Sequence, residues 1–279
     1  MACDTAFRVV ARCYLADLTA NHDATCRGDP VALHRMRIAL THLRTAILFF
    51  SPMVADTTRT RVRADLKWLN AHLGVMRDLD VAIERLKAID KRRPQPIPHY
   101  RAWIAKRAEI HRDLTRVLQS VRYQRLVKRA SDWIERGPWS IKRGKQAVLQ
   151  RASPVAAYSV HKLARWQEKL LKKSRKLPKM DTEKRHRLRL LNKKLSYSIG
   201  SFEYLFSDRK FSQQRTALKY LRKAQKSLGQ LNDDARGHSL AVALVREGIR
   251  VPFQFLSRKR EKRLIRETAA AYRKLAALE

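Results

Sequence analysis

Cysteine is scarce in this 279-residue chain, and its three copies all lie near the N-terminus. The sequence has no Cys-x-x-Cys pair among Cys3, Cys13 and Cys26. That spacing is typical of zinc sites and redox sites. Neither a disulfide framework nor a zinc site is therefore indicated. We expect free thiols, as in a protein of the reducing cytoplasm.

Long apolar runs are absent as well. The sequence holds no run of about 18 uncharged apolar residues, the length that a membrane-spanning helix requires. Asp4, Arg8 and Arg12 interrupt the first dozen positions, which excludes the apolar stretch of a secretory signal peptide. The sequence predicts a soluble cytoplasmic protein with no membrane partner.

Glycine is rare, with 8 residues, and the alternation of apolar and polar residues that marks β-strands is scarce. Nearly the whole chain has helical period instead, which predicts an all-α protein. Asp29 and Pro30 supply the cap and the first turn of one helix, which Ser51-Pro52 ends. In the first half we expect helices over residues 5–26, 30–50, 57–73, 78–90 and 99–136. In the second half we expect them over 154–177, 182–206, 212–229, 233–248 and 253–277.

Proline, glycine and short polar pairs mark the breaks between these helices. Residues 138–153 interrupt the helical period and predict a connector between a first repeat (1–137) and a second repeat (154–279) of a single domain. The short connections favour antiparallel neighbours and hence helix bundles. The other breaks fall at 94–98, which is Pro-rich, and at Pro178, Ser207-Asp208, Asn232-Asp233 and Pro252.

Acidic residues are few, with 25 Asp and Glu against 62 Lys and Arg, which gives a formal net charge of +37. Both halves of the chain are basic, so no charged tail explains the excess. So many like charges on one compact body repel each other, and a polyanion relieves this repulsion while it releases its own counterions. A polyanionic partner is therefore expected, although composition does not name the anion.

One four-residue pattern occurs twice, as His34-Arg35-Met36-Arg37 and as His186-Arg187-Leu188-Arg189. A second pair of landmarks follows in the same order, Leu73-Gly74 with Arg77-Asp78 and Leu228-Gly229 with Asn232-Asp233. Two motifs in the same order indicate an internal duplication.

Both basic helices place their cations at the edge of the apolar face. On a helix of about 3.6 residues per turn, His34, Arg37 and Arg44 border the apolar stripe of the first copy. In the second copy His186, Arg189, Lys193 and Tyr197 border the apolar stripe, and His186 and Arg189 are equivalent to His34 and Arg37. Long basic side chains can also pass the core edge into water without a function, but the repeated placement favours a basic lining that binds phosphate. Further candidates for this lining are Arg8, Arg12, Arg35, Arg77, Arg165 and Arg187.

The paired acidic residues Asp78 and Asp80, with Asp233 and Asp234, admit two interpretations. Such carboxylates can bind a metal, but each pair lies at the start of an expected helix, where Asp caps free N–H groups. We predict capping, and we expect neither a metal site nor a cofactor.

With these landmarks in place, the chain resembles the CHAD family, the conserved-histidine α-helical domain. The resemblance covers almost the whole chain and implies two pseudo-symmetric four-helix bundles around a basic central channel. It further implies non-catalytic binding of inorganic polyphosphate, often at polyphosphate granules with the proteins that metabolise the polymer. The polyphosphate-binding positions of the family motifs correspond, by this resemblance, to His34, Arg37, Arg44, His186, Arg189, Lys193 and Lys194. The chain departs from the family pattern at Thr41-His42-Leu43-Arg44 and at Ser196.

Two other functions stay open. The same charge suits an RNA- or DNA-binding protein, although no nucleic-acid motif is present and the five Trp are scattered. The paired histidines suit an enzyme that acts on phosphate esters or anhydrides. The sequence lacks the phosphate-binding loop and the other motifs of such enzymes, so we expect a binding protein and not an enzyme.

Overall fold

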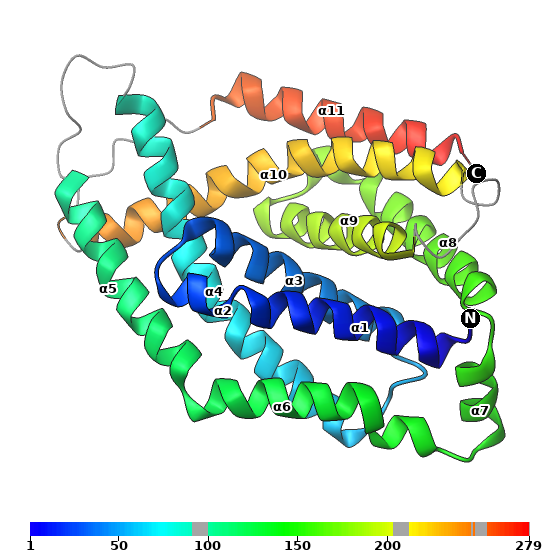
Figure 1. The fold of residues 1–279 in the computed structure, drawn as a ribbon. Helices are drawn as coiled ribbons and strands as arrows, with labels where there is room; N and C mark the ends of the chain where they lie inside the picture. Colours follow the sequence, from blue (N-terminus) through cyan, green and yellow to red (C-terminus); the bar gives the residue numbers. More distant parts are fainter. Residues whose placement is uncertain (91–99, 203–211, 247, 249–255, 279) are drawn as a thin grey trace. The chain divides into compact units, whose positions relative to one another are not determined.

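The computed structural model describes residues 1–90, 100–202, 212–246, 248 and 256–278. Helices make up the regular structure of these residues and none of them lies in a β-strand, so the all-α prediction is confirmed (Figure 1). The helices form two compact units. The first holds residues 1–153 and the C-terminal end of α10 (Ser212–Arg246), and the second holds residues 154–238 and α11 (Arg258–Ala276).

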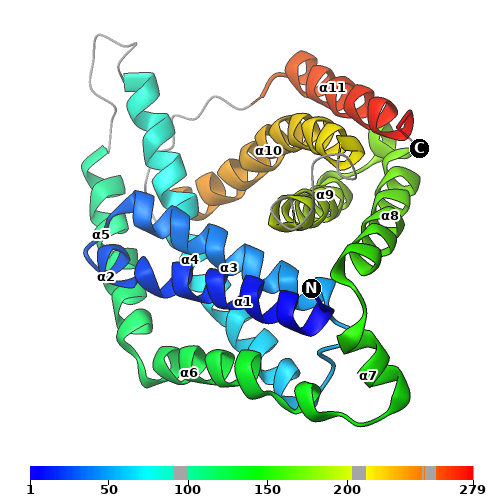
Figure 2. The same ribbon diagram turned by 45° about the vertical axis from the view of Figure 1, so that its right-hand side comes forward.

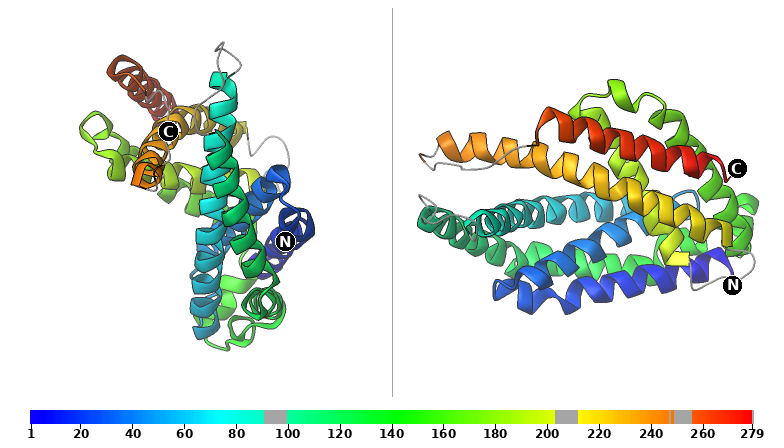
Figure 3. Two further views of the ribbon diagram at one scale, coloured as in Figure 1. Left: turned by 90° about the vertical axis from the view of Figure 1, so that its left-hand side faces the viewer. Right: turned by 90° about the horizontal axis from the view of Figure 1, so that it is seen from above.

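The first unit is a layered helical assembly in which each long helix packs on at least two others. Its elements are α1 (Cys3–Ala20), α2 (His22–Cys26), α3 (Pro30–Phe49), α4 (Thr57–Asp90), α5 (Tyr100–Gln119), α6 (Val121–Arg136), the short 3-10 helix η1 (Pro138–Ile141) and α7 (Lys145–Ala152). Helix α1 lies beside α3 (Figure 2), and α3 packs on α4. Helix α4 runs alongside α5 (Figure 3), and α6 contacts both α1 and α4.

Aromatic side chains fill the centre of this unit. The ring of Phe7 meets those of Phe50, Trp133 and Trp139 edge to face, with centroids 5.7, 5.6 and 5.3 Å away. Asp56 accepts hydrogen bonds from the indole N–H of Trp133 and the backbone N–H of Trp139 at 3.0 and 3.2 Å. These contacts join α1, the turn before α4, α6 and η1 into one core.

The second unit is held together by a buried polar chain. Its elements are α8 (Val155–Ser174), the 3-10 helix η2 (Leu177–Lys179), α9 (Thr182–Phe202), the first part of α10, and α11. The Asn192 side-chain amide donates to the carbonyl oxygen of Leu221 at 3.1 Å, and the Tyr272 hydroxyl donates to Asn192 Oδ1 at 3.1 Å. Helices α9, α10 and α11 are thus connected, and α8 packs on α9 and α11.

Two predicted breaks are wrong, because α4 and α10 are continuous helices of 34 and 35 residues. Gly74 and Gly229 lie inside these helices and not in turns. Buried Leu73, Met76 and Leu79 keep one apolar face in phase through the first of them, and this packing outweighs the weak helix propensity of glycine. Asp78 and Asp233 consequently lie in mid-helix and do not cap a helix start, which corrects the capping prediction.

Other boundaries differ in detail. The segment predicted as 5–26 divides into α1 and α2, and 99–136 divides at Ser120, whose hydroxyl accepts from Tyr123 N at 3.3 Å and caps α6. The predicted connector 138–153 is itself largely helical, as η1 and α7. The Asp29 cap is confirmed, since its carboxylate accepts from Val31 N at 2.7 Å. The breaks predicted at 94–98, Ser207-Asp208 and Pro252 lie outside the described residues.

Four helices of one half match four of the other in order and in length. Helices α1, α3, α4 and α5 have 18, 20, 34 and 20 residues, whereas α8, α9, α10 and α11 have 20, 21, 35 and 19. Both histidine motifs fall on the second helix of such a set, and both Leu-Gly landmarks fall on the third. Within the described ranges, no helix is long and apolar enough to cross a membrane.

Candidate functional site

Helix α3 presents the first basic motif at the edge of its buried face. Met36 and Leu40 are fully buried, while Arg37 is half-buried and His34 and Arg35 are exposed. Because the helix begins at Pro30, His34 is its fifth residue and lies just beyond the first-turn N–H groups. At these positions an anion would therefore bind to the side chains of α3 and not to free backbone N–H groups.

A second cation joins this face from the next helix. Arg44 on α3 lies near Arg63 on α4, and partial desolvation together with the charge of Arg63 lowers the pKa of the Arg44 guanidinium. Two guanidinium groups that repel each other in this way are stabilised by a shared anion. Sequence reasoning missed Arg63, because the proximity of α4 to α3 is a tertiary contact.

Helix α9 carries the second motif, and Asp181 caps its start by accepting from Lys184 N at 2.7 Å. Leu188, Leu195 and Ile199 are buried, and Arg189 and Lys193 are half-buried. A half-buried arginine beside a buried apolar row therefore occurs on α9, as Arg189, and on α3, as Arg37.

The two landmarks of the second half meet directly. His186 Nδ1 lies 2.6 Å from Asn232 Oδ1 on α10, and the Asn232 amide nitrogen lies 3.4 Å from Asp233 Oδ1. Because the Asn232 oxygen only accepts, the His186 Nδ1 carries the proton and donates. The imidazole is thus held in one orientation, with Nε2 as the remaining polar atom.

Additional cations of the second unit lie on α9 and α8. The Lys193 ammonium lies 5.4 Å from the ring centroid of Tyr197, a cation–π contact that orients both side chains. Lys194 is half-buried beside them. On α8, partial burial and the charge of Arg165 lower the pKa of Lys162, a residue that sequence reasoning missed.

Arg8, Arg12, Arg77 and Arg187 also contact other protein groups. Arg12 forms a double hydrogen bond with Glu135 on α6, with both distances 2.8 Å, and this bond raises the pKa of Arg12. The guanidinium of Arg8 lies 5.2 Å from the ring centroid of Trp139. Arg187 pairs with Glu183 one turn earlier, and Arg77 lies 3.4 Å from Glu84. Arg8 and Arg12 thus contact η1 and α6, whereas Arg37 and Arg44 project from α3.

The acidic pairs have structural partners as well. Asp80 forms an ion pair with Arg107 on α5 at 2.7 Å, and Asp234 accepts from the backbone N–H of Leu256 ahead of α11 at 2.8 Å. No group of three or more His, Cys, Asp or Glu side chains that could hold a metal ion is found among the described residues. These carboxylates therefore connect helices.

Known proteins resemble this chain in sequence and in fold. The family model described as CHAD domain matches residues 10–241. The chain belongs to the CHAD family. The crystal structure of the CHAD domain from the plant Ricinus communis is similar, with a TM-score of 0.76 and 22% sequence identity, over 100% of this chain and 93% of that one. At this identity the similarity shows a shared fold. No curated protein matches the chain significantly.

Proposed function

We propose that this CHAD protein binds inorganic polyphosphate without catalysing a reaction. The observation that carries the proposal is the matched placement of Arg37 and Arg189, which are half-buried beside the apolar faces of α3 and α9, on a chain of net charge +37. Arg37 and Arg189 occupy equivalent places in the two motifs. A polymer with regularly spaced negative charges suits two such rows, because each guanidinium offers paired donors to phosphate oxygens.

In this proposal the two halves are repeats that form pseudo-symmetric four-helix bundles, and their basic faces line one channel. His34, Arg37 and Arg44 bind the polymer from one side. His186, Arg189, Lys193 and Lys194 bind it from the other. Arg63 and Lys162 extend the lining, since each belongs to a repulsive cation pair. Arg8, Arg12, Arg77 and Arg187, each of which contacts another protein group, complete the proposed site.

The proposed setting is the cytoplasm, at polyphosphate granules or beside proteins that metabolise the polymer. Absence of catalysis is part of the proposal and has a direct test. Long-chain polyphosphate incubated with the protein, with and without magnesium, is expected to release no phosphate above the background of a protein-free control. Robust turnover would replace the binding role with an enzymatic one.

Retention on immobilised polyphosphate tests the site. The double variant Arg37→Glu with Arg189→Glu is expected to lose retention while keeping its helical circular dichroism. A matched control, Arg112→Glu with Lys172→Glu, makes the same charge change at exposed positions of α5 and α8 and is expected to stay bound. If both double variants behaved alike, the proposed faces would not be the site.

The net charge also suits general nucleic-acid binding. Competition with RNA distinguishes that function from polyphosphate binding. At equal phosphate concentration, RNA is expected to displace little bound polyphosphate. Equal displacement would make the protein a nonspecific binder of phosphate backbones.

A further inference from the structure

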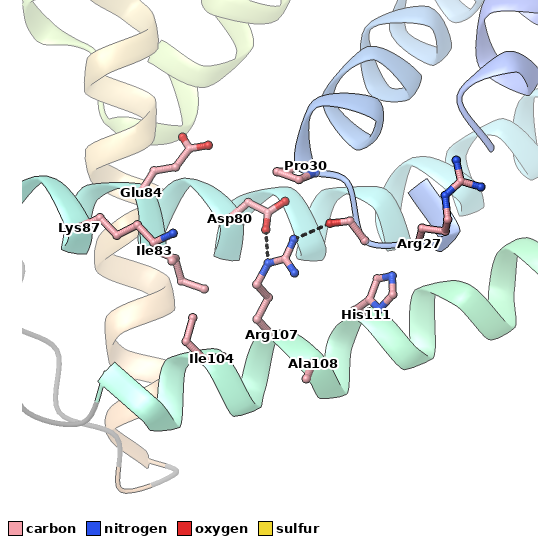
Figure 4. Close-up of a pocket in the computed structure, with 11 residues that line it drawn as sticks. Arg27, Pro30, Asp80, Ile83, Glu84, Lys87, Ile104, Arg107, Ala108 and His111 are labelled. Carbon is pink, nitrogen blue, oxygen red and sulfur yellow. Dashed lines mark hydrogen bonds and ion pairs between the residues drawn. The ribbon is translucent and has the colours of Figure 1, made fainter. Parts of the chain in front are cut away.

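A cavity of about 460 Å³ lies in the first unit between α4, α5 and the turn that enters α3. Figure 4 shows Asp80 and Arg107 reaching towards each other across it from α4 and α5. Its volume lies within the roughly 300–1,000 Å³ of typical small-molecule sites. None of the cations proposed for polyphosphate lines it.

The most informative group in this cavity is the carboxylate of Asp80. Its side chain is only 3% exposed, and Oδ1 accepts from Arg107 Nε at 2.7 Å. Oδ2 is buried and has no hydrogen-bond partner among the described residues. Burial raises the pKa of Asp80 despite the opposing effect of Arg107. An unpaired buried carboxylate oxygen is costly, so a ligand with an O–H or N–H donor is favoured here.

One cation contacts this carboxylate, and two others line the cavity. Arg107 is fixed by a second bond, from Nη2 to the carbonyl oxygen of Gly28 at 3.0 Å, and its remaining donors can reach a ligand in the cavity. Arg27 and Lys87 line the cavity with exposed side chains, and Glu84 is the one other acidic residue in the lining. The cations Arg27, Lys87 and Arg107 outnumber the two carboxylates in the lining, and this balance fits an anionic ligand.

The remaining lining is mostly apolar, and His111 on α5 adds a polar ring to it. Ile83 and Ile104 face the cavity from α4 and α5, with Pro30 and Ala108 beside them. Ile104 is 41% exposed, an unusual setting for a large aliphatic side chain next to charged groups. Inorganic phosphate is too small to cover the apolar side chains of this wall. An amino acid has one carboxylate and would pair with only one of the cations.

We propose that this cavity binds a nucleotide. The ribose hydroxyls donate to Asp80 Oδ2, the base covers Ile83 and Ile104 on the side of Lys87, and the phosphates extend past Arg107 towards Arg27 (Figure 4). A buried carboxylate that accepts from ribose hydroxyls is a common element of nucleotide sites in other folds. The proposal does not depend on polyphosphate binding, because the two sites share no residue.

Isothermal titration with ATP and with 2′,3′-dideoxy-ATP tests this site. The two probes have the same charge, so their attraction to the basic surface cancels in the ratio of affinities. Loss of hydrogen bonds to a buried carboxylate is expected to weaken the dideoxy probe at least about tenfold. Equal affinities would overturn the proposal.

Two variants locate the effect. Ile104→Glu adds a negative charge to an exposed position of the cavity wall and is expected to weaken ATP and abolish the preference. Val160→Glu, a matched change at an exposed position of α8, is expected to leave both unchanged. The variant Arg37→Glu with Arg189→Glu is expected to keep the preference while losing polyphosphate. A preference that survives Ile104→Glu would place the nucleotide elsewhere and overturn the assignment.

Discussion

At the scale of single residues, ion pairs make the stability of the fold depend on pH. Glu135 is the clearest case, because its bond to Arg12 lowers its pKa below the ordinary value of 4.5. The folded state therefore binds this proton less readily than the unfolded state does. The stabilisation is present above that ordinary value and is lost as the pH falls through the folded pKa.

The lowered pKa of Glu135 predicts how Glu135→Gln changes stability with pH. The variant is expected to unfold at a lower urea concentration than the parent at neutral pH, and the difference is expected to vanish well below pH 4.5. Urea titrations of both proteins at the two pH values measure it. A difference that persisted unchanged in acid would mean that the charge of Glu135 is not what stabilises the fold.

The buried hydroxyl of Tyr272 makes a second prediction. Tyr272→Phe removes the donor to Asn192 Oδ1 and leaves that buried oxygen without it, which is expected to cost about 1–3 kcal/mol of unfolding free energy. Tyr220→Phe, at a half-buried position of α10, is the control and is expected to change stability little. Equal unfolding midpoints for the Tyr272 variant and the parent would show that this bond does not hold the three helices together.

At the scale of elements, two glycines are expected to respond in opposite directions. Gly28 adopts a φ of +88° in the turn before α3, and a Cβ there would lie 3.3 Å from His111 Nε2. Gly28→Ala is expected to destabilise the protein by about 1–2 kcal/mol. Gly74 lies inside α4, where an added Cβ would meet no described atom within 4 Å, so Gly74→Ala is expected to stabilise by roughly 0.5–1 kcal/mol. Thermal unfolding of both variants tests the pair, and shifts of the same sign would contradict it.

The elements also show what the sequence can predict. Asp29 caps α3 as expected because Pro30 directly follows it and fixes the first turn. Asp78 has the same residue type but no break beside it, and the buried leucines of α4 carry the helix through. Local signals therefore placed helices correctly where a backbone constraint supported them, and they failed where tertiary packing overrode a weak signal.

The candidate site divides in the same way. Helical phase alone placed Arg37 and Arg189 beside the buried face of their helices, where the structure has them half-buried. The bond from His186 to Asn232 spans 46 positions, and Arg63 reaches Arg44 from another helix. Contacts of this kind depend on how helices pack, so no local pattern in the sequence predicts them.

At the scale of the whole molecule, charge is the dominant feature. A body of net charge +37 is destabilised by its own repulsion, and a bound polyanion reduces that cost. The central claim is that α3 and α9 act together on one polymer. Cooperation of two faces gives one tight binding event, whereas separate faces give two weaker ones.

Isothermal titration of long-chain polyphosphate into the parent, Arg37→Glu, Arg189→Glu and the double variant is the most direct measurement of this claim. We predict one polymer chain per protein for the parent, and a large loss of affinity in each single variant. Two independent binding events in the parent, with each single variant losing one and retaining the other at full affinity, would contradict it.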